Sequence, residues 1–356
     1  MTGRRWGALL CLRDTTTHPN SLGAAAGLLL DRFLPEPPDE WHPVARMGMA
    51  LGALERVLYR DRRGAGVVHA AAGVTLGAAV GALSSTAGAT TVAVSGRMLG
   101  RIATEVGDAL ERGDLDRARR LLPSLVGRDP TTLDEAEVVR AVVESVAENT
   151  VDAAVAPALW AAALGGTGAL GYRAANTLDS MVGHHSPRYE RFGWASARLD
   201  DALGWVPARV TASLVALVRP TRASAVLRTV RRDASAHPSP NAGVAEAAFA
   251  AALGVRLGGT NRYGDRVEER PALGAGPPPA RGDIRRAVAL SRDVSLALAA
   301  LLAVAARSPL RRPCRLAGAS HPPSWNRAEG VPTDGAAASR PGGRRESLTG
   351  RWEGFR

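Results

Sequence analysis

The sequence predicts an all-α, multi-pass integral membrane protein, a helical bundle with amphipathic helices at the membrane interface. Ala, Gly, Leu, Val and Arg dominate its 356 residues, and only 4% are aromatic, which favours close-packed helices over a β-sandwich. No charged residue occurs between Arg63 and Arg97, and about 20 apolar residues suffice to span a bilayer. Beyond Arg97 the apolar residues recur with helical spacing among charged ones, as in amphipathic helices.

The sequence contains no lysine, so all 45 of its basic residues are arginine. A Walker-A phosphate loop needs its GK[ST] lysine and Schiff-base catalysis needs a lysine amine, so both are excluded. The two cysteines, Cys11 and Cys314, lie at opposite ends of the chain and indicate neither a disulfide framework nor a zinc site. A reducing, cytosol-facing environment is the simpler interpretation.

The two ends of the chain show no clear targeting or core signal. Near the N-terminus Arg13 and Asp14 interrupt a short apolar run, so a secretory signal is not predicted. Residues 307–356 are rich in Arg, Pro and Gly and are expected to be disordered. This basic tail lacks interleaved aromatics, so we expect contact with lipid headgroups and no nucleic-acid partner.

Residues 64–96 give the clearest membrane signal. They consist mainly of Ala, Gly, Val and Thr, with little Leu and no Phe, so the stretch is only weakly lipophilic. Small residues of this kind allow helices to pack closely inside a bundle. The alternative for this stretch is a buried helical hairpin of a soluble protein.

Amphipathic helices are predicted over 97–152, separated by turns at 113–114 and 127–130. Thr132 followed by Glu135 resembles a capping box, which would open the last of these helices. That helix carries Glu137 and then a run of charged residues at every fourth position.

The charged residues Arg140, Glu144, Glu148 and Asp152 advance by about 40° at each step, so they form one continuous stripe. Such a stripe is usually a solvated face. Here it runs directly into the uncharged segment that begins at Ala153, so Glu148 and Asp152 would lie at or below a membrane interface. Ionisable groups in that position are costly and are functional candidates.

A short motif occurs on both sides of this uncharged segment. Asn149–Asp152 reads Asn-Thr-Val-Asp, and Asn176–Asp179 reads Asn-Thr-Leu-Asp. The helix from Ala153 to Leu164 would be roughly 18 Å long, short of the ~30 Å hydrocarbon core. A turn at 165–168 would therefore return the chain as a re-entrant hairpin and bring Asp152 and Asp179 together, whereas a straight span would separate them. The repeat is short, and chance recurrence is the alternative.

The segments that follow are less regular. A loop is predicted over 183–189, with adjacent histidines at 184 and 185 that make only a weak metal-binding signal. Arginines interleaved with aromatics over 191–209 suit a phosphate and a flat ring system, or an interfacial belt. The apolar stretches 210–218, 242–255 and 294–306 are each too short to predict a span. A loop-rich block over 237–264 brackets an Ala-rich helix that carries Glu246.

Six segments occur in an order that resembles the CobD/CbiB cobalamin biosynthesis proteins, the adenosylcobinamide-phosphate synthases. The resemblance covers roughly residues 22–306 and implies that they form one membrane synthase domain. Residues 1–21 are an extension unlike the apolar start usual in the family, and the tail after Ser308 resembles no part of it. The segments that carry it are 31–44 (with Asp31, Glu36-Pro37-Pro38 and His42-Pro43-Val44), Leu125-Val126-Gly127-Arg128-Asp129, Glu144–Asp152, Asn176–Gly183, Phe192–Asp201 and His237–Gly243.

The resemblance implies an enzyme of the cell (inner) membrane that acts in cobalamin biosynthesis. It would join adenosylcobyric acid to (R)-1-amino-2-propanol O-phosphate through an amide bond, giving adenosylcobinamide phosphate. ATP would drive the reaction, most simply through an acyl phosphate, with Mg²⁺ on its phosphates. The lipid bilayer and other cobalamin-assembly enzymes are the expected partners.

Residue roles follow from this chemistry as hypotheses. Asp152 and Asp179 would hold the metal. Either Glu148 or Glu144 would deprotonate the incoming ammonium, with His184 as the second choice. The candidates for orienting ligands or binding phosphate and propionate groups are Arg128, Asn149, Arg173, Asn176, Arg198 and Asn241.

Three other functions remain as alternatives. A membrane prenyltransferase would also use paired Asn and Asp motifs to hold Mg²⁺-pyrophosphate. A corrinoid-binding scaffold would bind ligand without consuming ATP. A transporter should show longer and clearer spans than these.

Overall fold

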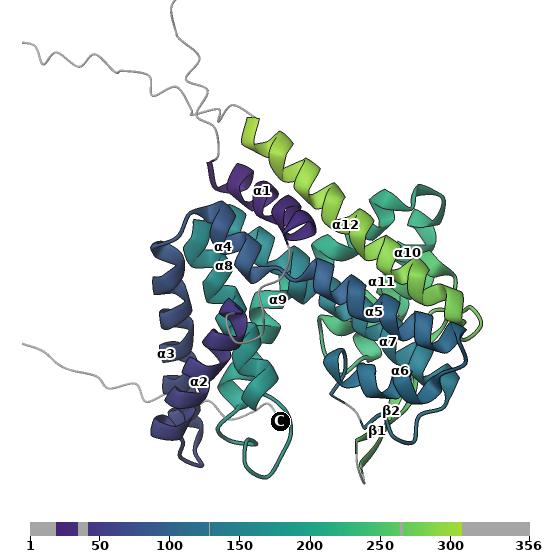
Figure 1. The fold of residues 1–356 in the computed structure, drawn as a ribbon, viewed down its shortest axis with the longest axis horizontal. Helices are drawn as coiled ribbons and strands as arrows, with labels where there is room; N and C mark the ends of the chain where they lie inside the picture. The colour runs from purple at the N-terminus through teal and green to yellow at the C-terminus, as the bar shows by residue number, and fades with distance from the viewer. Residues whose placement is uncertain (1–18, 35–41, 128, 264–265, 308–356) are drawn as a thin grey trace, which may run out of the picture. The chain divides into compact units, whose positions relative to one another are not determined.

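The computed structural model describes residues 19–34, 42–127, 129–263 and 266–307. The expectations for the extension (1–18) and for the tail (308–356) lie outside these residues. The described chain is almost entirely helical, as predicted (Figure 1). Its α-helices are α1 (Pro19–Phe33), α2 (Pro43–Leu58), α3 (Arg63–Ala82), α4 (Thr86–Ala93), α5 (Gly96–Glu111), α6 (Leu115–Leu121), α7 (Glu135–Thr150), α8 (Ala156–Val182), α9 (Trp194–Val218), α10 (Ala223–Asp233), α11 (Ala242–Leu253) and α12 (Arg281–Arg307).

Four helical segments are long and apolar enough to cross a bilayer by length and composition: α3, the continuous run Glu135–Val182, α9 and α12. The all-α membrane fold is therefore confirmed. The apolar stretches 210–218 and 294–306, which seemed too short, are the ends of the 25-residue α9 and the 27-residue α12. The stretch 64–96 is divided into α3 and the shorter α4.

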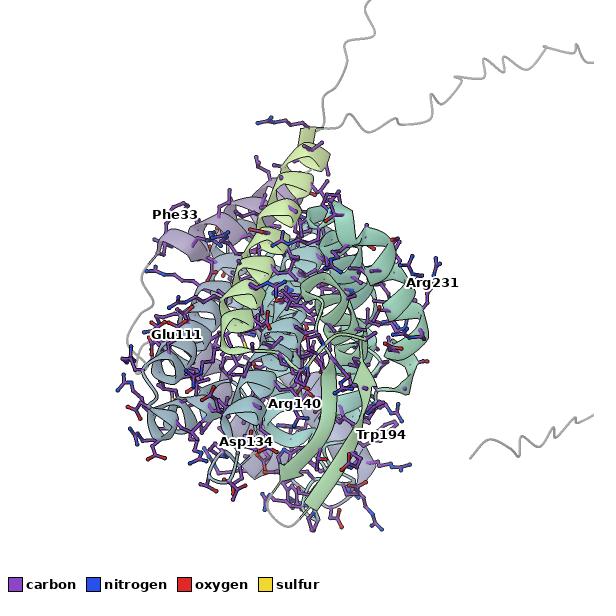
Figure 2. The ribbon with its side chains drawn as sticks, turned by 90° about the vertical axis from the view of Figure 1, so that its right-hand side faces the viewer. Phe33, Glu111, Asp134, Arg140, Trp194 and Arg231 are labelled. Carbon is purple, nitrogen blue, oxygen red and sulfur yellow. The ribbon has the colours of Figure 1, made fainter. Side chains whose placement is uncertain are left out.

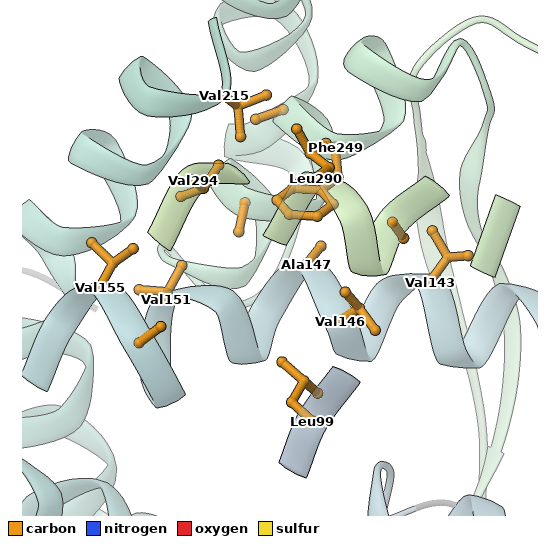
Figure 3. Close-up of a cluster of buried hydrophobic side chains, with 14 of the residues drawn as sticks. Leu99, Val143, Val146, Ala147, Val151, Val155, Val215, Phe249, Leu290 and Val294 are labelled. Atoms are coloured by element: carbon orange, nitrogen blue, oxygen red, sulfur yellow. The ribbon is translucent and has the colours of Figure 1, made fainter. Parts of the chain in front are cut away.

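The core surrounds α7. Val143, Val146 and Ala147 of this helix lie among side chains of α5, α11 and α12, including the fully buried Phe249 and Leu290 (Figure 3). A helix with valines on most of its surface must be enclosed on several sides, because each exposed apolar side chain forfeits roughly 1.5–3 kcal/mol of burial. α7 is therefore the central helix of the core formed by the described residues.

The start of α7 differs from the prediction. The N-cap is Asp134, whose carboxylate accepts a hydrogen bond from the Glu137 N–H at 2.8 Å, while the Glu137 carboxylate accepts one from the Asp134 N–H at 2.9 Å. The capping box expected at Thr132 and Glu135 is therefore two residues too early. Thr132 and Asp134 are both of residue types that are favoured at the N-cap, so the residue types alone do not decide where the helix begins.

A stripe of small residues packs α3 against the second half of α8. A Cβ atom at Gly77 would lie 2.6 Å from the Leu170 carbonyl oxygen, and one at Gly81 would collide with the Gly166 carbonyl. These contacts pair the end of α3 with the middle of α8, so the two helices run antiparallel. The close approach expected from the small residues of this stretch is confirmed.

The predicted reversal of the chain occurs at Gly165, inside the run assigned to α8. Gly165 has φ 66° and ψ −150°, a backbone conformation that is essentially restricted to glycine. The second half of α8 returns beside the first, so that Tyr172 contacts Asp152, 20 positions earlier. The candidate span Glu135–Val182 is therefore a bent hairpin rather than one straight rod.

A two-stranded antiparallel sheet, which the sequence analysis did not predict, follows α11. Its strands are β1 (Leu257–Tyr263) and β2 (Arg266–Leu273). Arg140 of α7 lies beside this hairpin (Figure 2) and donates hydrogen bonds to the carbonyls of Gly258 and Thr260, both at 2.6 Å. The hairpin is thus fastened to the central helix.

Candidate functional site

Asp152 lies in a π-helical turn, Val151–Val155, that joins α7 to α8. Such turns insert one extra residue into a helix and are frequent at functional sites. The Tyr172 hydroxyl donates a hydrogen bond to Asp152 Oδ1 at 3.2 Å. The charge of Asp152 also interacts with the carboxylates of Glu148 and Asp179. The two motif aspartates are therefore on the same side of the hairpin, as predicted.

The second motif faces α9. Asn176 Nδ2 donates a hydrogen bond to Asp200 Oδ1 at 3.2 Å, and the carboxylate of Asp179 interacts electrostatically with Asp201. Five carboxylates of α7, α8 and α9 therefore gather within one region: Glu148, Asp152, Asp179, Asp200 and Asp201. So much negative charge favours the binding of a cation.

Arg173 supplies positive charge at the same place. Its Nη2 donates to the Ser95 hydroxyl at 2.9 Å, and its Nη1 lies 3.5 Å from Asn176 Oδ1. Its guanidinium interacts electrostatically with Asp152 and with Asp31 of α1. The buried Nε–H has no hydrogen-bond partner among the described residues, and buried donors normally have one. A phosphate oxygen of a ligand would satisfy it.

Glu148 is exposed and joins two cavities. One, of about 30 Å³, is lined in the described chain by Glu148, Val151, Asp152, Asp200, Ser239, Asn241 and Ala242. The other, of about 120 Å³, is lined by Leu125, Val126, Gly127, Glu144, Ser145, Glu148, Glu246 and Arg270. A group that lines both cavities can exchange a proton with a ligand in either of them.

Glu144 and Asn149 have contacts that the sequence did not indicate. Glu144 Oε1 accepts a hydrogen bond from the Gly258 N–H at 2.9 Å, so it fastens β1 while lining the larger cavity. Asn149 Nδ2 donates to the Ser145 carbonyl at 2.9 Å. Asn149 lines a separate cavity of about 100 Å³ next to Ser95.

Three of the predicted ligand-binding residues remain: Arg198, Asn241 and Arg128. Arg198 is exposed and its charge interacts with Asp201. Asn241 lines the smaller cavity, and its Nδ2 donates to the Asp201 carbonyl at 2.8 Å. Arg128 lies outside the described residues. These contacts associate Arg198 and Asn241 with the same region of α9.

His184 lies in an exposed loop, where its ring packs edge-on against Tyr189 at 5.1 Å. The same loop is held to α2 by Glu55, whose Oε1 accepts hydrogen bonds from Arg188 at 3.0 Å and from the Tyr189 hydroxyl at 2.9 Å. The bond to Glu55 raises the pKa of the Arg188 guanidinium above its usual value. The ring contact of His184 therefore lies within this loop and not in the carboxylate region.

The carboxylates of this region could supply some, but not all, of the ligands of a hard cation such as Mg²⁺. Among the described residues no three His, Cys, Asp or Glu side chains group closely enough to hold a metal ion by themselves. Mg²⁺ is commonly bound by one or two carboxylates, completed by water and substrate phosphates. Asp152 and Asp179 fit that arrangement, with phosphate oxygens as the further ligands.

Three residues of the region were missed from the sequence. Tyr172, Asp200 and Asp201 were assigned no role, although the two aspartates belong to a quoted family segment. A pair of acids on a helix with apolar surroundings was the available signal. Tyr172 gave none, since only the turn at Gly165 brings it to Asp152.

The fold and site define an all-α membrane protein with a polar, carboxylate-rich site beside a helical hairpin. Residues 24–291 match the CobD/Cbib protein family, and the chain belongs to that family. The match lies inside the region 22–306 that the sequence analysis assigned to one domain.

Curated relatives have similar lengths and shared names. The chain is 51% identical over 305 residues to "Cobalamin biosynthesis protein CobD" of Mycobacterium tuberculosis (strain ATCC 25618 / H37Rv), covering 82% of this chain and 96% of the relative. A protein of the same name from Mycobacterium bovis is 52% identical over 299 residues, 80% of this chain and 95% of the relative. One from Chromobacterium violaceum is 44% identical over 281 residues, 74% and 89%. No solved structure matches the chain.

Proposed function

We propose that this chain is an adenosylcobinamide-phosphate synthase of cobalamin biosynthesis. It would form an amide bond between adenosylcobyric acid and (R)-1-amino-2-propanol O-phosphate at the expense of ATP. The observation that carries the proposal is the family match over 24–291, which includes the hairpin and the carboxylates around it. The names of the curated relatives support the pathway.

The chemistry makes separate demands on the site. A carboxylate is a poor electrophile at neutral pH, and ATP with Mg²⁺ would supply the activating phosphoryl group. In our proposal Asp152 and Asp179 hold the metal, and Arg173 neutralises phosphate charge. Glu148 takes a proton from the incoming ammonium, because the neutral amine is the nucleophile. Asn176 orients Asp200 and Arg173 in this arrangement.

We further propose that the chain is a multi-pass protein of the cell (inner) membrane and contacts the lipid bilayer. The four segments of sufficient length and apolar character support a membrane location. Several of their large apolar side chains, such as Val67, Val68 and Leu301, are exposed, as side chains facing lipid would be. Association with other cobalamin-assembly enzymes belongs to the same proposal.

Reconstitution of the reaction tests the function. Purified protein in detergent would receive adenosylcobyric acid, aminopropanol phosphate, ATP and Mg²⁺, with products followed by mass spectrometry. We expect the corrinoid amide, formed in step with ADP or AMP. Corrinoid binding with no ATP consumption would instead indicate a scaffold. Turnover of an isoprenoid diphosphate would indicate a prenyltransferase, and uptake of corrinoid into vesicles a transporter.

A further inference from the structure

A second group of charged side chains adjoins the cavity of about 120 Å³, and two of its members line it. These side chains belong to elements to which the proposed mechanism assigns no role. The centre of this group is Glu246 of α11, a helix whose 12 residues are all buried. Glu246 is only 1% exposed. A carboxylate at such a depth is costly unless other charges or hydrogen bonds compensate it, so its neighbours must stabilise it.

One of these neighbours is His237, whose Nε2 lies 3.7 Å from Glu246 Oε1. The backbone of Ser239 holds the other ring nitrogen: Nδ1 is 3.0 Å from Ser239 N and 3.2 Å from Ser239 O. Gly243 allows the ring to sit there, because a Cβ at that position would lie 2.5 Å from His237 Cβ. The segment His237–Gly243 thus seats one imidazole against a buried carboxylate.

The imidazole in turn contacts Arg270 of β2, whose Nη1 lies 3.2 Å from His237 Nε2. Arg270 is half-buried and lines the cavity of about 120 Å³. The row Glu246, His237 and Arg270 therefore fixes the position of a guanidinium at the wall of that cavity.

The same cavity is lined by Glu148, to which the mechanism assigns the amine proton. Carboxylates and a held guanidinium in one small cavity are complementary to a zwitterion. Arginine presents a rigid fork of donors that matches a phosphate or carboxylate. The arrangement can bind an amine at Glu148 while its anionic group is held by Arg270.

We propose that Arg270 binds the anionic group of the amine substrate, and that His237 and Glu246 are positioning residues which orient its guanidinium. This inference rests on the proposed function and deepens it, since it makes Arg270 the residue that distinguishes a phosphorylated amine from a free amino alcohol. The ligand class is a small phosphate ester that carries an ammonium.

Replacement of Arg270 by Gln tests the proposal in the full chain. We expect the KM for aminopropanol phosphate to rise about 10- to 100-fold, as the loss of a charge-assisted phosphate contact implies. The Kd of aminopropanol phosphate, measured by calorimetry, should rise with it. The Kd of unphosphorylated aminopropanol should change less than about threefold. Arg270→Lys should restore part of the affinity, because it keeps the charge.

The positioning role is tested with His237→Gln and Glu246→Gln, which should weaken binding of the phosphorylated amine in the same direction and by less. The matched control is Arg256→Gln. Arg256 is exposed and lines the neighbouring cavity of about 340 Å³, but it does not line the cavity of about 120 Å³ that holds Glu148. Melting midpoints within a few degrees of wild type confirm that the variants fold.

Two failures can be told apart. If the wild type forms no amide, the proposed function is wrong, and the binding measurements still decide the role of Arg270. If the wild type forms amide and Arg270→Gln leaves the KM and Kd for the phosphorylated amine unchanged, only the present inference is overturned. An equal loss of affinity for both amines overturns it as well.

Discussion

Tyr172 makes a hydrogen bond to one of the two motif aspartates of the proposed site. It is 2% exposed, and its hydroxyl reaches Asp152 across the hairpin. A second tyrosine, Tyr189, makes the same kind of bond to a carboxylate, Glu55, in the loop that also holds His184. These two tyrosine–carboxylate hydrogen bonds of the described residues are chemically alike, and one lies inside the proposed site and the other outside it.

This pair gives a prediction at the residue scale. Tyr172→Phe should lower kcat about tenfold, because a hydrogen bond to a charged group contributes about 1.5–3 kcal/mol and its loss leaves Asp152 less well oriented. Tyr189→Phe should leave kcat unchanged. Steady-state turnover of both variants checks this, and equal kcat values for the two variants would contradict it.

At the residue scale, the sequence indicated which acidic residues to select, but it did not indicate the side chains that contact them. Asp152, Asp179 and Glu148 could be selected because ionisable residues beside an uncharged segment are unusual. The sequence analysis named His184 and gave His237 no role, although His237 is buried beside Glu246 and His184 is exposed. Burial depends on contacts between residues distant in sequence, which no local pattern contains.

At the scale of elements, the packing of α3 on α8 depends on the absence of side chains. Gly77 faces the Leu170 carbonyl, whereas a Cβ atom at Gly64, in the first turn of α3, would meet nothing within 4 Å. One helix therefore offers a test position and its own control.

Gly77→Ala should lower the free energy of unfolding by about 1–3 kcal/mol, the usual cost of inserting atoms into a packed interface. Gly64→Ala should be neutral or slightly stabilising, since Ala has the higher helix propensity. Thermal melts in detergent measure both. A Gly77→Ala protein as stable as Gly64→Ala would contradict the close packing of the two helices.

A second element-scale prediction concerns the end of α10. Arg232 holds the pKa of Asp233 below its usual value by hydrogen bonding, and Asp233 Oδ2 also accepts a bond from the Gly274 N–H at 2.9 Å. A lowered pKa in the folded state means that this stabilisation is present above the unfolded value of about 3.9 and is lost as pH falls through the folded value.

Asp233→Ala should therefore melt below wild type at pH 7, and the difference should shrink as pH falls toward about 3. Melting midpoints of the two proteins across this range give the measurement. A difference that stays constant down to the lowest pH would show that the charge of Asp233 is not the stabilising feature.

Elements were predicted where local signals were strong. The helical run through 133–152 and the turn at 165–168 followed from periodicity and glycine content. The lengths of α9 and α12 were underestimated because Arg and Asp residues interrupt their apolar stretches. The β-hairpin was missed because Gly, Arg and Glu dominate its strands, and these residues are poor strand formers.

At the scale of the whole molecule, composition, the uncharged stretch 64–96 and helical periodicity together predicted an all-α membrane protein. What composition could not predict is which helices meet. The enclosure of α7 by α5, α11 and α12 joins segments from both halves of the described chain (Figure 3). It places the carboxylates of α7, α8 and α9 beside the loop before α11, so the proposed site draws on residues from Ser95 to Arg270.

The account depends most on the two motif aspartates, which the turn at Gly165 brings to one side of the hairpin. The direct test is the rate of corrinoid amide formation by Asp152→Asn and Asp179→Asn, with Asp116→Asn on the exposed surface of α6 as the control. We predict that each site variant loses at least about 100-fold in kcat while still binding adenosylcobyric acid, and that the control matches wild type. Wild-type kcat in either site variant would contradict the account.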